Sequence, residues 1–275
     1  MPDPTQKATR SPDPSAAAKS SMRLALGQQR WPMVDGSAPL LLVPVGSLEQ
    51  HGPHLPLDTD TMVAVAVTRA VATRLEAMGR LVAVAPPVNY GASGEHEGFP
   101  GTVSIGHEAL TLLLTELGRS ACGWASGVIF VNGHGGNAPT MVRAVSRLRA
   151  EGRAVAWTGC VAKGGDAHAG ATETSLLRHL APWSVRVDLA VTGAMAPIES
   201  LLPQLRDEGV RAVSASGVLG DATRSSTDQG KAIFEEMVRT LVGELAEIDV
   251  GDDGRLRPGS SHARQVPRRP AAAGA

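Results

Sequence analysis

The side chains best suited to chemistry in this sequence lie in one polar turn that directly follows an apolar run. The run covers residues 40–45, and the turn carries acidic and imidazole groups at Glu49, His51, His54, Asp58 and Asp60. Gathering these groups is costly unless a cation holds them, because like charges repel one another and polar groups lose water. The pattern therefore predicts a divalent metal site, either with one metal or with two metals that share a carboxylate.

The spacing within this turn indicates which groups can meet. Glu49 and His51 are two residues apart, so an extended backbone projects both side chains to the same side. Asp60 can return to that point, just before a helix that we expect from about residue 61. Residues 40–45 are long enough for a buried strand, and α/β proteins place ligands and catalysts at the carboxyl ends of such strands.

Two later segments repeat this arrangement. The turn Asn132-Gly-His-Gly-Gly-Asn137 follows another apolar run, and His168 and Glu173 come after a third. Taken alone, a histidine in a glycine-rich turn is more often a hydrogen-bonded loop residue, and a glutamate in the first turn of a helix is ordinary because the helix dipole tolerates it. Three polar turns after three strands are poorly explained by coincidence, since ionisable residues cluster at functional sites. We therefore expect His134, His168 and Glu173 to join the site.

Strands that alternate with helices predict an α/β fold, here a single three-layer α/β/α domain with a mostly parallel central sheet. The expected strands are at 40–45, 81–85, 127–131 and 154–158. The expected helices are at about 61–78, 107–124, 138–150 and 227–248, with a shorter one that ends near Leu180. Residues 185–191 are interpreted as an edge strand and residues 194–227 as mixed loops.

The tails differ from the central part of the chain. Residues 1–37 and 250–275 are rich in small residues and proline and lack apolar periodicity, so we expect both to be disordered. This leaves residues 38–249 as the folded domain. Met22 is an alternative to Met1 as the true start.

Composition excludes several classes of protein. The chain has 275 residues, enough for one large α/β domain, and its net charge of -1 gives no electrostatic reason to expect nucleic acid. No apolar run approaches the length of a membrane span, and no cleavable secretion signal is evident. The two cysteines, Cys122 and Cys160, are interpreted as buried thiols of a reducing compartment. We therefore expect a cytoplasmic protein without nucleic-acid or membrane partners.

A long irregular segment at residues 88–104 interrupts the pattern of strands and helices. Structureless insertions of this length inside a compact domain are usually functional. The candidate substrate-binding residues are His54, Asp58, Tyr90, Ser93 and His96. Other roles are open: His54 and Asp58 can instead orient metal ligands, and Glu95 and His96 can instead stabilise their own loop.

Three motifs resemble the creatininase superfamily of metal-dependent amidohydrolases, over residues 38–248. They are Glu49-Gln-His51-Gly-Pro-His-Leu-Pro with Asp60, Asn-Gly-His134-Gly-Gly-Asn, and His168-Ala-Gly-x-x-Glu173-Thr-Ser. The resemblance implies that Glu49, Asp60 and His134 hold one metal, and that Asp60 bridges to a second metal held by His51. Creatininase has a further carboxylate ligand two residues after its counterpart of His134. Gly136 stands there in this chain, which argues against creatinine hydrolysis and leaves Glu173 as the best substitute ligand.

Finer features resemble the mycofactocin-system branch of this superfamily. They are Leu-Pro-Leu-Asp-Thr-Asp-Thr61, Tyr90-Gly-Ala-Ser-Gly-Glu-His96 and Gly-Val-Leu-Gly-Asp221. The branch trims the modified mycofactocin precursor peptide in actinobacteria, so the resemblance implies that this peptide is the substrate. The implied reaction hydrolyses the amide bond before the modified C-terminal Val-Tyr unit and releases the cyclised dipeptide-derived product. The resemblance also implies two metals per subunit, with Fe(II) favoured over Zn(II) or Mn(II), and a homo-oligomer.

The chemistry implied by this reading needs a metal and a proton donor. A metal lowers the pKa of bound water and polarises the scissile carbonyl. His168, without a metal to hold, is expected to give a proton to the departing amine, and Glu173 is either a metal ligand or a catalytic residue. Two rivals are open: a related amidohydrolase acting on a small cyclic amide or formamide, and a catalytically silent metal-binding partner. The uncoordinated His168 argues against the silent partner, since a purely structural site does not need it.

Overall fold

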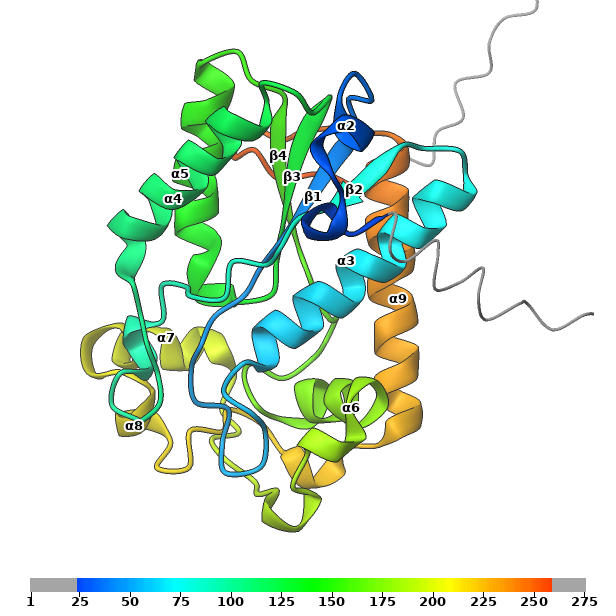
Figure 1. The fold of residues 1–275 in the computed structure, drawn as a ribbon. Helices are drawn as coiled ribbons and strands as arrows, with labels where there is room; N and C mark the ends of the chain where they lie inside the picture. The colour runs from blue at the N-terminus through cyan, green and yellow to red at the C-terminus, as the bar shows by residue number, and fades with distance from the viewer. Residues whose placement is uncertain (1–23, 259–275) are drawn as a thin grey trace, which may run out of the picture.

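A four-stranded parallel sheet forms the centre of the computed structural model, which describes residues 24–258. The strands are ordered β2-β1-β3-β4. Their bounds are β1 Leu40–Val45, β2 Val82–Val84, β3 Gly127–Asn132 and β4 Val155–Gly159. All the paired strands are parallel, so their carboxyl ends meet at one edge of the sheet, the lower edge in Figure 1.

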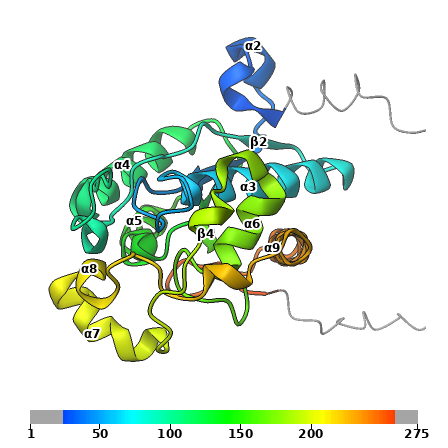
Figure 2. The same cartoon turned by 90° about the horizontal axis from the view of Figure 1, so that it is seen from below.

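Helices cover both faces of the sheet, which confirms the predicted α/β architecture. One face packs against α3, α6 and α9, and the other packs against α4 and α5 (Figure 2). Their bounds are α3 Thr59–Ala77, α4 Gly106–Ala121, α5 Ala138–Ala150, α6 Ala171–Leu180 and α9 Thr227–Ala246. Along β1, Leu42 contributes to the first of these cores and Leu41 to the second. Because the strands are buried on both faces, their sequences are continuous apolar runs rather than alternating patterns.

The other elements are mostly short. Their bounds are η1 Leu26–Gln28, α2 Trp31–Val34, η2 Gly94–His96, η3 Gly135–Asn137, η4 Pro182–Ser184, η5 Val187–Leu189, α7 Ile198–Glu208, α8 Val210–Val213 and η6 Ala222–Arg224. The helices α7 and α8 lie in the stretch predicted as mixed loops. The sequence does not predict α7, because Pro203 lies inside this helix and proline normally interrupts a helix.

The predicted edge strand at residues 185–191 is wrong. The segment contains the single turn η5, and Val187 and Leu189 are 50% and 40% exposed. The backbone N–H of Arg186 donates to the carbonyl of His54 at 2.9 Å rather than to a neighbouring strand. The edge strands of the sheet are β2 and β4. Residues 185–191 pair with neither, although their apolar residues alternate as in a strand.

The described ends of the chain pack against the two edges of the sheet. Ala25 forms a parallel bridge to Val84 on β2, and Arg255 forms one to Trp157 on β4. The structure thus differs from the expectation of disorder at residues 24–37 and 250–258. The remaining parts of the two predicted tails, residues 1–23 and 259–275, lie outside the described residues. Between residues 24 and 258, no helix is long and apolar enough to cross a membrane.

Candidate metal centre

Three loops at the carboxyl edge of the sheet converge on one buried cluster. They follow β1, β3 and β4, and the first turns of α3 and α6 complete the cluster. The structure brings together the six predicted metal-site and catalytic residues, which are Glu49, His51, Asp60, His134, His168 and Glu173. Five of these side chains are buried, and the Glu173 side chain is 23% exposed. The clustering therefore follows from the parallel sheet, which brings the carboxyl ends of its strands together at one edge.

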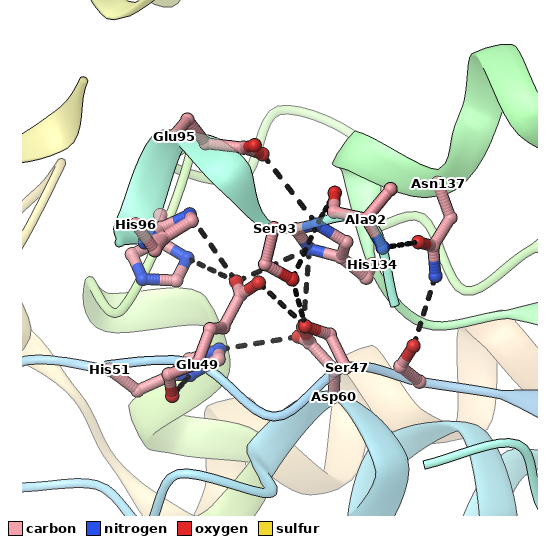
Figure 3. A network of polar contacts seen from close by, with 12 residues as sticks. Ser47, Glu49, His51, Asp60, Ala92, Ser93, Glu95, His96, His134 and Asn137 are labelled. Carbon is pink, nitrogen blue, oxygen red and sulfur yellow. Dashed lines mark hydrogen bonds and ion pairs between the residues drawn. The ribbon is translucent and has the colours of Figure 1, made fainter. Parts of the chain in front are cut away.

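One set of three donor atoms consists of Glu49 Oε1, Asp60 Oδ2 and His134 Nδ1 (Figure 3). The His134 nitrogen lies 3.2 Å from each of the two carboxylate oxygens. Both oxygens are buried, and within residues 24–258 neither has a hydrogen-bond partner. Buried carboxylate oxygens are costly without a partner, and a cation at this point would satisfy both.

A second set consists of His51, Asp60 and Glu173. His51 Nε2 lies 3.2 Å from Asp60 Oδ1 and 3.8 Å from Glu173 Oε2. Asp60 therefore turns one oxygen toward each set, which is the geometry of a bridging carboxylate. Imidazole and carboxylate donors suit Zn(II), Mn(II) and Fe(II) alike.

The electrostatics of the cluster favour positive charge at its centre. Burial would lower the pKa of His51, but the carboxylates of Asp60 and Glu173 outweigh burial and raise this pKa to about 10. Burial would raise the pKa of Glu49, but the neighbouring imidazoles, that of His134 above all, hold it well below its ordinary value. Burial raises the pKa of Glu173 to about 7, although His51 opposes the change. A divalent cation can supply the positive charge that these carboxylates favour.

Several polar side chains that the sequence analysis left without a role hold the donors in place. Ser47 Oγ donates to Glu49 Oε2 at 2.7 Å. The side chain of Asn132 makes two hydrogen bonds to the backbone of His134. Its Nδ2 donates to the His134 carbonyl at 2.6 Å, and its Oδ1 accepts from the His134 backbone N–H at 3.3 Å. Asn137 Nδ2 donates to the carbonyl of Gly46 at 3.0 Å, which ties the turn after β3 to the turn after β1. Asn132 and Asn137 are the first and last residues of the glycine-rich motif at 132–137. Their place in this motif is the sequence signal from which a supporting role could have been predicted.

The outer nitrogen of His134 is also engaged. Its Nε2 lies 3.2 Å from the carbonyl of Ala92 and 3.6 Å from Glu95 Oε1. A proton on Nε2 can be donated to this carbonyl, which leaves the lone pair of Nδ1 for the first donor set. Such a partner on the far side of a histidine fixes the tautomer and orientation that a metal requires.

The candidate substrate-binding residues divide into two groups. His96 and Ser93 are buried at the centre, with the His96 ring 4.4 Å from the His168 ring and the Ser93 hydroxyl against that of Ser47. The other three belong to none of the donor sets. His54 Nε2 bonds to Thr174 Oγ1 at 2.8 Å and so links the first turn to α6. The last two are exposed: Asp58, just before α3, and Tyr90, at 47% exposure.

Comparison with known proteins identifies the family. The family model described as Creatininase, creatinine amidohydrolase, matches residues 28–245. The chain belongs to the creatininase family. Among its relatives, the mycofactocin precursor peptide peptidase of Mycobacterium ulcerans is 53% identical over 237 residues, covering 84% of this chain and 94% of the relative. The protein of the same name from Mycolicibacterium smegmatis is 54% identical over 232 residues, with the same coverage.

Solved creatininases share the fold. A manganese creatininase superposes with a TM-score of 0.69 at 26% identity and covers 82% of this chain and 98% of its own. A Zn–Zn form of a creatininase mutant gives a TM-score of 0.69 at 25% identity with the same coverage. This creatininase-family chain is thus a metal-dependent hydrolase, and the paired donor sets described above are its candidate metal centre.

A side chain at Gly136 should disturb this centre. A Cβ atom added there would overlap His134 Nε2 and lie 2.8 Å from the Ala92 carbonyl, so the histidine would have to move. We expect Gly136→Ala to weaken metal binding by about 10–100-fold, the range typical of disturbing a ligand's support. Metal titration of the purified variant checks this value. Gly135→Ala is the matched control, because a Cβ at Gly135 meets nothing within 4 Å, and equal affinity in the two variants would contradict the argument.

Proposed function

We propose that this chain is a mycofactocin precursor peptide peptidase. It hydrolyses the amide bond before the modified C-terminal Val-Tyr unit of the precursor and releases the cyclised dipeptide-derived product. The observation that carries the proposal is identity of 50–54% to relatives of that name, over 84% of this chain and 94% of each relative. The buried donor sets that share Asp60 supply a centre suited to amide hydrolysis.

Two divalent ions occupy the centre in this proposal. Glu49, Asp60 and His134 would hold the first ion, and His51, Asp60 and Glu173 would hold the second. Among the residues that the structure describes, Glu49 Oε1 and Asp60 Oδ2 have no hydrogen-bond partner, which supports the first assignment. The second oxygen of Asp60 lies near His51 and supports a shared carboxylate. We favour Fe(II) because of the resemblance to the mycofactocin peptidases. Zn(II) and Mn(II) are the alternatives, since the donors suit all three ions and solved creatininases include manganese and zinc forms.

The side chains of this chain then divide the work of hydrolysis. When bound, the ions supply an activated water and polarise the scissile carbonyl. His168 lies at the edge of the donor sets, with Nδ1 3.7 Å from Glu49 Oε1, and moves a proton to the nitrogen of the departing amine. Ser93 and His96 line the same centre and contact the substrate. The amide is thereby cleaved to a carboxylic acid and an amine, which at neutral pH ionise to a carboxylate and an ammonium group.

A second candidate function is hydrolysis of a small cyclic amide or a formamide. It is favoured by weaker similarity to the creatinine amidohydrolase of Pseudomonas putida, 34% identical over 112 residues, 38% of this chain and 41% of that relative. A formylamino-pyrimidine deformylase of Methanobrevibacter ruminantium is 29% identical over 142 residues, 50% of this chain and 58% of the relative. Such an enzyme would use the same donors with different substrate loops. The much longer match to the peptidases makes this the weaker candidate.

The deciding experiment uses the fully modified precursor peptide. We expect the Fe(II)-loaded chain to release the C-terminal two-residue-derived fragment, detected by mass spectrometry, because the metal centre supplies the activated water. The same protein treated with a chelator should release none, and restoring Fe(II) should restore release. If the metal is bound and no fragment appears, small cyclic amides and formamides become the substrates to test.

A further inference from the structure

Gln50, which separates Glu49 from His51, lies at the centre of a network of polar contacts. Its buried amide nitrogen is 2.9 Å from His96 Nδ1, 3.0 Å from His168 Nε2 and 3.1 Å from the carbonyl of Gly217. Its Oε1 accepts the backbone N–H of Gly52 at 2.9 Å. A backbone N–H can only donate and a carbonyl can only accept, so these two backbone contacts fix which end of the amide is oxygen and which is nitrogen.

The amide nitrogen has two hydrogens and three polar neighbours, and a further contact decides which two of these neighbours accept them. The backbone carbonyl of Gln50 lies 2.8 Å from His168 Nε2, and within residues 24–258 no other group donates to this carbonyl. If His168 Nε2–H donates to it, the amide hydrogens are left for Gly217 and for His96 Nδ1, and each group has a partner. The opposite assignment leaves the buried carbonyl unpaired, which folded proteins avoid.

We propose that Gln50 is a positioning residue that sets the tautomers of His96 and His168. Both rings carry their proton on Nε2, but they turn opposite ends toward Glu49. His96 Nε2 lies 3.4 Å from Glu49 Oε1, whereas His168 presents Nδ1 to the same oxygen at 3.7 Å. His96 therefore offers an N–H to the centre, and His168 offers a lone pair.

This difference divides two tasks in the reaction, a consequence that rests on the proposed function. His168 Nδ1 takes a proton from water as the new C–O bond forms, and it returns this proton to the leaving nitrogen as the C–N bond breaks. His96 Nε2–H donates a hydrogen bond to the carbonyl oxygen while that oxygen gains negative charge. Water is consumed, and a carboxylic acid and an amine are produced. At neutral pH the acid gives its proton to the amine, which leaves a carboxylate and an ammonium group, so atoms and charge balance.

The tautomers can be measured without any substrate. We expect nitrogen NMR of isotope-labelled histidine in the zinc-loaded full chain to show both rings protonated at Nε2 and bare at Nδ1. His96→Asn and His168→Asn assign the signals. In Gln50→Glu the carboxylate cannot donate to His96 Nδ1, so the His96 proton should move to Nδ1. The control Gln204→Glu adds the same charge on the exposed side of α7 and should move nothing.

A His96 ring protonated at Nδ1 in the unaltered chain, or a tautomer unchanged by Gln50→Glu, overturns the proposal. Activity gives a second test. His96→Ala should lower kcat by about 100-fold with little change in KM, as loss of an oxyanion donor does. His96→Gln, whose amide N–H can take the place of Nε2–H, should recover part of the loss, and equal kcat in the two variants overturns the donor role. Failure of the unaltered chain to cleave the peptide would contradict the proposed function alone, since the NMR result does not depend on cleavage.

Discussion

Replacing Asp60 with alanine is expected to abolish both metal binding and turnover. Asp60 contributes one oxygen to each donor set, so its loss leaves both sets incomplete at once. Disturbing the partner of a metal ligand already costs about 10–100-fold in affinity, and loss of a shared ligand should cost more than 100-fold. Metal content after dialysis and kcat on the precursor peptide are the two measurements.

The matched control for this variant is Asp228→Ala. Asp228 is also an aspartate in the first turn of a long helix, α9, but it is exposed and belongs to none of the donor sets. The isosteric Asp60→Asn separates the charge of the side chain from its shape and should behave like Asp60→Ala. Normal metal loading in either Asp60 variant would contradict the bridging role.

Replacing His168 with alanine is expected to separate metal binding from catalysis. Two complete donor sets remain without His168, so the metal content should not change. Loss of the group that moves the proton should lower kcat by about 10²–10⁴-fold, the usual contribution of general acid–base catalysis. Single-turnover cleavage of the precursor together with metal analysis measures both quantities.

His179→Ala provides the control for the His168 variant. His179 lies near the end of α6, packs on Phe234 at 5.9 Å between ring centroids, and belongs to none of the donor sets. Its loss should leave both metal content and kcat unchanged. If His168→Ala lost its metal, His168 would instead act as a ligand beside Glu49 and His51, the third group of donors close enough to hold an ion.

The position of the candidate site could be predicted from the sequence because a parallel sheet gathers its strand ends. Once β1, β3 and β4 are recognised as buried parallel strands, residues that directly follow them must lie at one edge. Glu49 and His134 are placed by this rule alone. Asp60 needs one further step, the return of the chain into α3.

The supporting contacts could not be predicted in this way. Gln50 lies within a motif, but its partners His96 and His168 are 46 and 118 residues away, and only the folded loops bring them together. Periodicity also failed for residues 185–191, where apolar residues alternate as in a strand but find no sheet edge. Alternating apolar residues indicate that one face of a segment is buried. Whether the segment forms a strand depends on whether the rest of the fold leaves a sheet edge free for it to pair with.

The contacts at the two ends of the described chain have a consequence for solubility. The outer edges of a sheet expose N–H and C=O groups that can pair with another molecule and start aggregation. Here Ala25 lies against β2, and residues 254–256 pair with β4 through hydrogen bonds at Trp157 of 2.8 and 3.0 Å. The segments around Ala25 and residues 254–256 therefore shield the two edge strands of the sheet from pairing with another molecule. A chain trimmed to residues 38–249 would keep every metal donor and expose both edges.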